Sequence, residues 1–413
     1  MGEKPYTMDK NGEMEIDWLT QEDKNHINFF DQFHCWSGMW RSKKSIQWTY
    51  FWLSQMIAFS LVYFYSFYFL LSELELLAHL IHHMMVAADD IMYIYLLNIH
   101  RIRVETIHDY ASKTYNYDSG IVREKHKKLM TEQLKLYPKM SKFIFLTTVA
   151  TAMSLEVNYL LEATYLKSYV TMYPMYLPID LNHPVTYTIV VFLQHLQVFI
   201  SMILCGGLMS ILFVVWSHLK VELDTLTFAI THVDELVEEK LRHFSYTNPA
   251  DKEKAKAEFY NGFCYHFARH HAAIKRYFGA FQISCKVTMT FVLISGLICF
   301  ACVGITSVTE NIGIKLKFFV VMVIQTLIIY SWSWVGQDIS DKNAALQNII
   351  GGTHWWKMPK TCHSTLKLML VGTSRPMLLY TLIGQPNNID SFMDMTASSY
   401  KIFNMVYQVK FSS

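Results

Sequence analysis

Between residues 185 and 216 the chain reads VTYTIVVFLQHLQVFISMILCGGLMSILFVVW, and these 32 residues include no Asp, Glu, Lys or Arg. A helix needs about 20 predominantly apolar residues to cross a bilayer core roughly 30 Å thick. Five more runs of comparable length are nearly uncharged, at residues 46–71, 76–97, 143–161, 287–307 and 316–334. The sequence therefore predicts an all-α fold and a polytopic membrane protein.

The composition indicates the same class. Of the 413 residues 52% are hydrophobic and 17% are charged, whereas an ordinary globular domain carries about a quarter charged residues. The net charge of +2, with both signs outside the apolar runs, predicts no nucleic-acid partner. The first 45 residues are polar and contain eight acids, so we expect no cleaved signal peptide.

The seven cysteines contain one C-x-x-C pair, Cys299 and Cys302, which lies inside an apolar run. Without a second pair this pattern predicts neither a zinc site nor a disulfide framework. We expect the cysteines to be mostly buried as small apolar side chains, and we predict no cofactor.

The basic residues predict the orientation of the spans. The segments before the first span, between the second and third, and between the fourth and fifth hold 6, 10 and 10 Lys and Arg residues, and the other three connections hold 0, 1 and 1. Loops rich in Lys and Arg stay in the cytoplasm. We therefore expect a cytoplasmic N-terminus.

The tail after the sixth span is too long for one crossing and contains the turn-forming run GQPNN at residues 384–388. Residues 365–383 contain Lys367, Arg375 and Pro376, which are costly in lipid, so we expect a helix that is cytosolic or buried in protein. Residues 389–410 can cross once, with their polar side chains against protein or water. Seven crossings result, and eight remain an alternative.

The expected organisation has six parts. In chain order they are a cytosolic N-terminal segment (1–45), spans one to four (46–216), a cytosolic helical anchor (217–286), spans five and six (287–336), a cytosolic connection with a first tail helix (337–383), and a second tail helix with an outside C-terminus (384–413). Apolar residues at helical spacing in the anchor predict long extensions of spans four and five, interrupted near residues 245–251.

Two histidine groups could carry chemistry. His79, His82 and His83 form an H-x-x-H-H pattern, and His266, His270 and His271 form H-x-x-x-H-H. Membrane di-iron oxidases use such patterns, because several neutral imidazoles must converge on the irons. Here the predicted topology places the two groups on opposite sides of the bilayer, which argues against a shared metal centre.

The outer halves of spans two, three and four offer faces with a few hydrogen-bonding groups among apolar and aromatic side chains. That is the usual make-up of a small-molecule site, although plain helix packing gives the same pattern. Asp89 and Asp90 in span two are expensive in lipid, and we expect one of them to face the protein interior. A proton relay is an alternative, but the neighbouring spans offer only Glu156 as a further acid.

The last helix carries a stripe at 3 and 4 spacing through Ser398, Lys401, Met405 and Val409. Small or polar residues that give way to bulky apolar ones suit a pore with a hydrophobic constriction. Packing is the alternative, and a pore would require an oligomer because one helix cannot enclose it.

The tail resembles the insect odorant receptor family in the order of its motifs. Trp334-Val335-Gly336-Gln337 comes first, followed by Trp355-Trp356, Pro359, residues 366–370, Arg375-Pro376 and Ser399-Tyr400 with Phe403. The seven-span plan with the N-terminus inside and the long loop after span four also match. The chain resembles a ligand-selective tuning receptor rather than the shared co-receptor, whose inner loop is longer.

The resemblance implies a subunit of an odorant-gated, non-selective cation channel in the plasma membrane of olfactory sensory neurons. Such a subunit assembles with odorant receptor co-receptor subunits into a heterotetramer, is surrounded by membrane lipid, conducts cations and binds a small volatile odorant. The aromatic pocket candidates of this sequence suit an aromatic odorant. The implied ligand-binding positions are His79, His83, Met153, Val157, Phe192, His195, Phe199, Phe319 and Val320. The implied pore and gate positions are Ser398, Lys401, Met405, Gln408 and Val409.

The resemblance implies binding rather than catalysis. A related gustatory receptor channel is the main alternative, followed by a membrane transporter or a di-iron membrane oxidase. A G-protein-coupled receptor would need the opposite orientation, and no Asp-Arg-Tyr or Asn-Pro-x-x-Tyr motif lies at a helix end.

Overall fold

The architecture comes from a computed structural model, which describes residues 13–15, 45–99, 113–115, 117–166, 171, 173, 175–307 and 312–411. The helices run in the order α2 (Ser45–Leu70), α3 (Leu74–Ile99), α5 (Gly120–Leu134), α6 (Tyr137–Leu166), α7 (Pro184–Thr231), α8 (Val233–Arg242), α9 (Pro249–Ser307), α10 (Ile312–Gly352), α11 (Lys360–Thr373) and α12 (Ile389–Phe411). A short 3₁₀ helix, η1 (Trp355–Lys357), precedes α11. The strands β1 (Glu13–Glu15) and β2 (Lys113–Tyr115) form one antiparallel pair.

The predicted helical membrane fold is confirmed, with this small pair of strands as the addition. Within the described ranges seven helices have 23 or more residues, namely α2, α3, α6, α7, α9, α10 and α12, and they coincide with the seven expected spans. Four segments of the described chain are long and apolar enough to cross a membrane by composition: Gln47–Leu70, Pro184–Thr231, Pro249–Thr306 and Phe318–Gly352. The other three long helices carry more polar residues.

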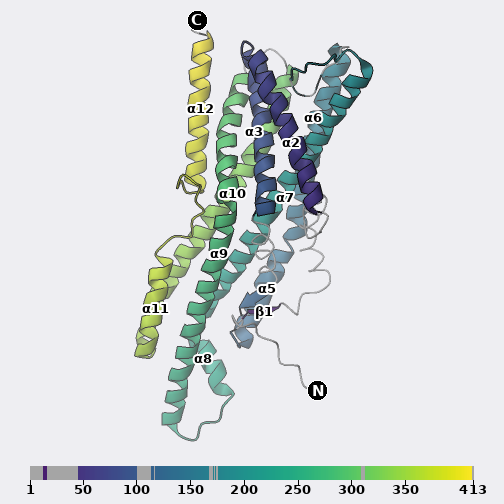
Figure 1. Cartoon of the computed structure of the whole chain (residues 1–413). Helices are drawn as coiled ribbons and strands as arrows, with labels where there is room; N and C mark the ends of the chain where they lie inside the picture. Colours follow the sequence, from purple (N-terminus) through teal and green to yellow (C-terminus); the bar gives the residue numbers. More distant parts are fainter. Residues whose placement is uncertain are drawn as a thin grey trace.

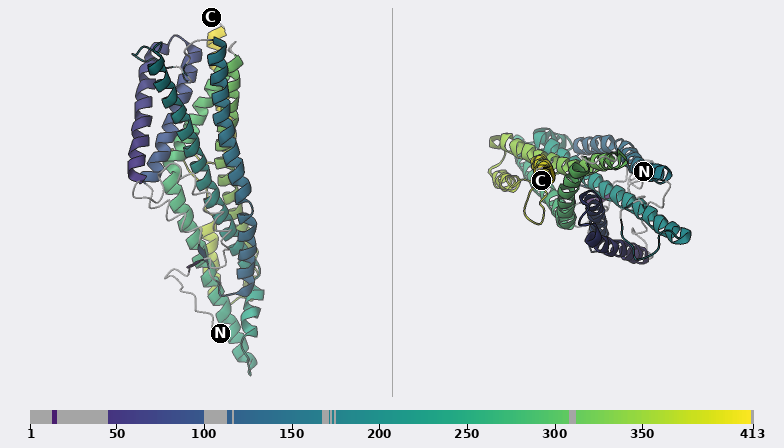
Figure 2. Two further views of the ribbon diagram at one scale, coloured as in Figure 1. Left: turned by 90° about the vertical axis from the view of Figure 1, so that its right-hand side faces the viewer. Right: turned by 90° about the horizontal axis from the view of Figure 1, so that it is seen from above.

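The molecule is elongated because three helices are much longer than a bilayer is thick (Figure 1). The 59 residues of α9 extend for about 88 Å and the 48 residues of α7 for about 72 Å, at 1.5 Å per residue. In Figures 1 and 2, α2, α3, α6 and α12 surround the upper halves of these long helices, whereas α5, α8 and α11 lie at their lower halves. The predicted extensions of spans four and five are confirmed.

The predicted interruption of the anchor lies between Arg242, where α8 ends, and Pro249, where α9 begins. The side-chain oxygen of Asn248 accepts a hydrogen bond from the backbone N–H of Ala250 at 3.1 Å. Asn before a helix and Pro at its first position are favourable, because the first N–H groups of a helix have no partner within the helix.

The main hydrophobic core lies where α7, α9 and α10 run side by side. Leu212, Phe281 and Trp332 are among its fully buried members. Two polar contacts also join α7 to α10. The indole N–H of Trp216 donates to Asp338 at 2.7 Å, and Lys342 pairs with Asp224 at 2.5 Å. Cys264, Cys285, Cys299, Cys302 and Cys362 are buried and Cys205 is partly buried, as expected; Cys35 lies outside the described residues.

The first tail helix is shorter than predicted. We expected helix over residues 365–383, but α11 ends at Thr373. Pro376 restricts the residue before it to extended conformations and has no N–H to donate, so the helix cannot continue through it. The side-chain amide of Asn343 on α10 caps this end by donating to the carbonyl of Thr373 at 2.9 Å.

Residues 374–388 form a folded connection that is fastened to two helices. The N–H of Leu382 donates to the Thr290 hydroxyl on α9 at 2.8 Å, and the Ser333 hydroxyl on α10 donates to the side-chain oxygen of Asn387 at 3.2 Å. Gly336 permits this approach, since a Cβ there would lie 2.1 Å from the Asn387 carbonyl oxygen. Gly384 forms the turn at a φ of +78°, a conformation that suits glycine.

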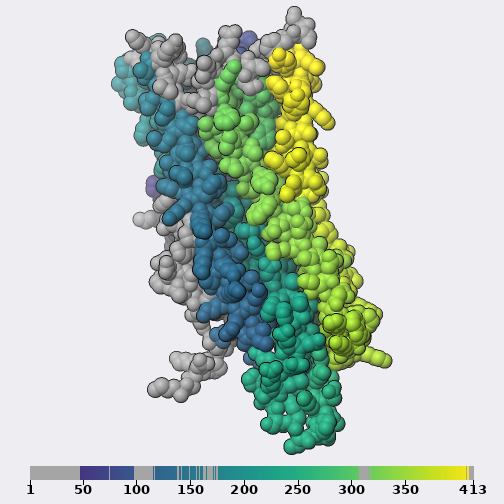
Figure 3. Space-filling view, turned by 180° about the vertical axis from the view of Figure 1, so that it is seen from behind, coloured from purple at the N-terminus to yellow at the C-terminus, as the bar shows by residue number. Residues whose placement is uncertain are grey.

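The helix α12 packs against α9 and α10 along one face. Met395 and Ser399 are buried, and the Ser399 hydroxyl donates to the Leu297 carbonyl of α9 at 3.3 Å. Phe403 packs on Gly304, where a Cβ would come within 2.7 Å of its ring. The other side is uncovered, and Figure 3 shows α12 in yellow along the edge of the molecule.

Candidate functional site

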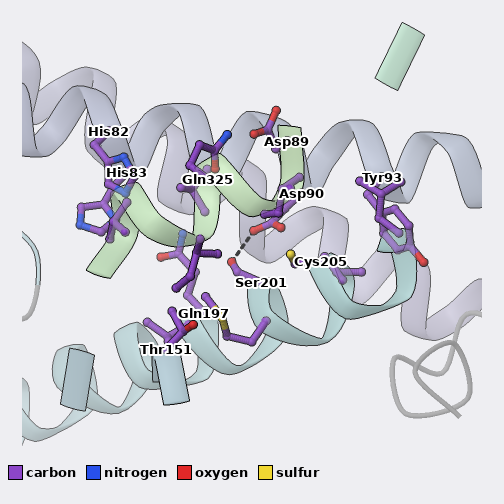
Figure 4. Close-up of a pocket in the computed structure, with 18 of the residues that line it drawn as sticks. His82, His83, Asp89, Asp90, Tyr93, Thr151, Gln197, Ser201, Cys205 and Gln325 are labelled. Atoms are coloured by element: carbon purple, nitrogen blue, oxygen red, sulfur yellow. Dashed lines mark hydrogen bonds between the residues drawn. The ribbon is translucent and has the colours of Figure 1, made fainter. Parts of the chain in front are cut away.

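A cavity of about 120 Å³ lies among the helices of the upper half (Figure 4). Its walls come from α3, α6, α7, α9 and α10, together with Tyr173 from the connection between α6 and α7. Most of the lining is apolar, as at Val86, Val198 and Ile324. The polar lining consists of His82, His83, Asp89, Asp90, Thr151, Gln197, Ser201 and Gln325. An apolar cavity with a few polar groups is what small-molecule sites in proteins look like.

The end of the cavity nearest the start of α3 is aromatic. The ring of His83 lies against Tyr173, with 3.8 Å between the ring centroids. His82 Nδ1 lies 3.2 Å from Cys299 Sγ of α9, and its ring contacts Phe318 of α10 with centroids 5.5 Å apart. These contacts connect α3 to α9, to α10 and to the connection after α6.

Two carboxyl groups lie about two turns further along α3, and each is held by a serine. Asp90 is buried and accepts a hydrogen bond from the Ser201 hydroxyl of α7, whereas Asp89 accepts one from the Ser295 hydroxyl of α9 at 2.6 Å. Adjacent residues of a helix point about 100° apart, so the pair contacts both neighbouring helices. The expectation that one acid faces the interior is met by Asp90.

Gln197 on α7 fixes the outer wall of the cavity. Its side-chain oxygen accepts a hydrogen bond of 2.8 Å from the buried Tyr63 hydroxyl of α2. A buried amide that is satisfied in this way keeps one orientation, because losing the bond would leave a polar group unpaired. Helix α2 thus contributes to the shape of the cavity without lining it.

Of the nine positions proposed for ligand binding, His83 lines this cavity and His79 lies one turn before it. His79 is buried, with its ring 5.2 Å from that of Phe318. His195 is half-buried and pairs with Glu156 at 2.7 Å, and Val320 is partly buried. The remaining five side chains are exposed in the isolated chain: Met153, Val157, Phe192, Phe199 and Phe319. A role for these positions in ligand binding stays a prediction.

The cavity lies among spans two, three, four and six, the spans that carry the nine predicted positions, with Val292 added from span five. Several lining residues are one or two positions away from those named from the sequence. On α10 the lining is Val321, Ile324, Gln325 and Ile328, whose spacing of 3 and 4 marks one face of the helix. Tyr173 carried no signal in the sequence, because it lies in an irregular connection.

On α12 the side chains of Ser398, Lys401, Met405 and Gln408 are exposed. Val409 belongs to the helix, but its side chain lies outside the described residues. The uncovered face of α12 therefore includes the four described members of the proposed pore set, and their role in a pore stays a prediction.

The two histidine groups lie far apart. His82 contacts Cys299, which is 29 residues from His270 on the same helix α9, or about 43 Å at 1.5 Å per residue. The two groups cannot share one metal centre at that separation.

The second histidine group belongs to a buried polar network below the cavity. Glu222 on α7 accepts hydrogen bonds from His126 of α5 at 3.1 Å and from His270 of α9 at 2.6 Å. The Tyr117 hydroxyl lies 2.5 Å from the other ring nitrogen of His270. Burial disfavours ionisation of Glu222, but the two histidine hydrogen bonds and their charge outweigh it and hold its pKa well below its usual range. The network joins α5, α7 and α9 in the lower half.

Comparison with known proteins places the fold. Residues 104–400 match the family described as 7tm Odorant receptor. The insect olfactory receptor OR5 from Machilis hrabei in complex with eugenol superposes with a TM-score of 0.77 at 10% identity, over 94% of this chain and 98% of that chain. A second structure of the same receptor gives a TM-score of 0.70 with the same identity and coverage. No curated protein sequence matches the chain.

Proposed function

Because the chain belongs to the 7tm odorant receptor family, we propose that it is the odorant-binding subunit of a ligand-gated, non-selective cation channel. Its place of action is the plasma membrane of olfactory sensory neurons, with the N-terminus and the lower helical bundle in the cytoplasm. The basic residues of the inner loops support that orientation.

The cavity is the observation that carries this proposal. At about 120 Å³ it is close in size to an engineered apolar cavity of roughly 150 Å³ that binds benzene. A small volatile with one ring fits such a space, and aromatic side chains line one end of it. The OR5 structure with eugenol is an example of a small aromatic molecule bound to a protein with this fold.

The uncovered face of α12 supports the channel part of the proposal. A helix with Ser398, Lys401, Met405 and Gln408 exposed is poorly suited to lipid, because charged and amide groups are costly there. Packed around a central axis with other subunits, the same face lines an aqueous pore. We propose a heterotetramer with co-receptor subunits, in which fewer copies of Lys401 repel the permeating cations.

The route from cavity to pore is short. Val292 of α9 lines the cavity, and four to five residues later Gly296 and Leu297 contact α12, at Met395 and Ser399 respectively. A ligand opens the gate only if it binds the open arrangement more tightly than the closed one. A shift of α9 against α3 or α7 would change both the shape of the cavity and the surface of α9 against which α12 packs.

The test is voltage-clamp recording from cells that express this chain with and without a co-receptor, under a panel of volatile odorants. We expect odorant-evoked cation currents from the pair and little current from the chain alone. Robust currents from the chain alone would contradict the assembly proposed here, and silence in both cases with the protein at the surface would contradict the channel.

A matched pair of variants on α7 tests the cavity itself. Val198→Trp fills the cavity from a buried position, whereas Ile189→Trp adds the same ring at an exposed position of the same helix. We expect the first to abolish the response and the second to preserve it at equal surface expression. Equal responses would show that the ligand binds elsewhere.

A further inference from the structure

We propose that the cavity selects small organic amines, whose ammonium group pairs with the carboxylates of Asp90 and Asp89. This inference rests on the proposed function and names the chemical class of its ligand. Both acids line the cavity, and both lie in the membrane-spanning part of α3 (Figure 4). Ionisable groups at such depth are expensive and usually have a functional partner.

The two carboxyl groups have few hydrogen-bond partners in the protein. An ionised carboxylate can accept about four hydrogen bonds, and here one serine hydroxyl donates to each, Ser201 to Asp90 and Ser295 to Asp89. The second oxygen of Asp89, Oδ1, is buried without a hydrogen-bond partner among the described residues. In that part of the chain no ion pair joins either acid to Lys, Arg or His.

The cavity wall offers no permanent cation as a counter-charge. Among the described residues that line it there is no Lys or Arg, and the basic groups are His82 and His83 at the aromatic end. His83 precedes Asp90 by seven residues, or about 10 Å along α3 at 1.5 Å per residue. The two acids therefore lie between the histidine end of the cavity and the end lined by Tyr93 (Figure 4). The distance from the histidine end to the acids is about the length of a one-ring molecule with a short polar arm.

An ammonium group binds beside these two acids more tightly than a neutral group does. It brings up to three N–H donors and a positive charge, and charge-assisted hydrogen bonds are about twice as strong as neutral ones. Burial without a counter-charge favours the neutral form of a carboxyl group. An amine that takes up the proton of the acid forms an ammonium–carboxylate pair with it inside the cavity. An alcohol of the same shape brings a single donor, and a hydrocarbon brings none.

The experiment compares three ligands of nearly equal size on the chain expressed with a co-receptor: benzylamine, benzyl alcohol and ethylbenzene. At neutral pH benzylamine carries the charge and the other two are uncharged. A charged hydrogen bond contributes about 1.5 to 3 kcal/mol, so we expect benzylamine to activate at concentrations about 10- to 100-fold lower than benzyl alcohol. Ethylbenzene should be weaker still.

Variants then assign the effect to the acids. Asp90→Asn keeps the size of the side chain and removes its charge, and we expect it to reduce the advantage of benzylamine over benzyl alcohol to about threefold or less. Asp89→Asn should act in the same direction. The control is Asp180→Asn, an exposed acid outside the cavity, which should leave the advantage unchanged. Surface labelling verifies expression of each variant.

The outcomes separate the two levels of the proposal. If benzyl alcohol or eugenol evokes currents while benzylamine is equal or weaker, the amine inference is overturned and the odorant-gated channel stands. An advantage for benzylamine that persists in both Asp→Asn variants also overturns the assignment to these acids. If no volatile of any class evokes a current, the proposed function itself fails.

Discussion

Replacing Glu222 by Gln should destabilise the lower half of the protein without touching the cavity. Glu222 is buried on α7 and receives hydrogen bonds from His126 of α5 and His270 of α9. Gln has the same shape, but its amide presents one oxygen and one NH₂ group. The oxygen can accept from one histidine, and the NH₂ group then faces the N–H of the other.

The magnitude follows from what is lost. A hydrogen bond to a charged group is worth about 1.5 to 3 kcal/mol, and breaking a buried charged network costs about 3 to 5 kcal/mol. Because Gln retains one of the two bonds, we expect a loss of about 3 kcal/mol. With an unfolding entropy of about 2.1 cal/mol/K per residue, this lowers the melting temperature of a 413-residue chain by roughly 3 to 4 °C.

Thermal melts of detergent-solubilised protein, followed by size-exclusion fluorescence, measure this shift. The matched control is Glu238→Gln on α8, the same chemical change at an exposed carboxylate that pairs with Arg242 at 4.0 Å. An exposed ion pair contributes little to stability, so this variant should have the same melting temperature as the unmodified protein. If the two variants have the same melting temperature, the hydrogen bonds to Glu222 do not stabilise the fold.

Three further outcomes are expected. Burial lowers the pKa values of His218 and His271 from 6.5 to about 4, so between these pH values the unfolded chain binds more protons than the folded chain. The free energy of unfolding therefore falls as the pH drops from about 6.5 to about 4, by up to about 1.4 kcal/mol per pH unit for each histidine. Thermal melts across that pH range measure this loss. Gly336→Ala should lower the melting temperature, because its Cβ would meet a backbone oxygen at 2.1 Å and overpacking costs about 1 to 3 kcal/mol, whereas Gly279→Ala meets nothing within 4 Å and should be neutral or stabilising. Lys401→Gln should raise the single-channel current of the co-expressed channel at an unchanged half-maximal odorant concentration, since it removes an exposed positive charge from the proposed pore face; an unchanged current would place this residue away from the ion path.

The positions of the helices could be predicted from the sequence because uncharged apolar runs of about 20 residues are typical of membrane-spanning helices and rare in other structures. The run at 46–71 became α2 at Ser45–Leu70, and the tail segment 389–410 became α12 at Ile389–Phe411. The end of α11 at Thr373 does not follow from the apolar pattern, which continues to Ile383; the helix ends there because Pro376 restricts the backbone before it.

The rotation of each helix could not be predicted in the same way. Along residues 185–216 of α7 no residue is charged. The predicted ligand-binding positions on this helix include His195 and Phe199, whereas Gln197 and Ser201 line the cavity. Lipid is as apolar as leucine, so periodicity does not distinguish a face against lipid from a face against protein. Asp90 was recognisable because a carboxyl group is costly wherever it faces lipid.

The way in which α12 is attached gives it the mechanics of a lever. The segment before it is held on α9 by the hydrogen bond from Leu382 to Thr290 and on α10 by the hydrogen bond from Ser333 to Asn387. The absence of a side chain at Gly336 makes room for the backbone of Asn387. The 23 residues beyond this pivot form a rod about 34 Å long. A tilt of about 5° at the pivot would carry the far end by about 3 Å, and Met405, about 24 Å along the rod, by about 2 Å, so small rearrangements near Asn387 become larger displacements along the proposed pore face.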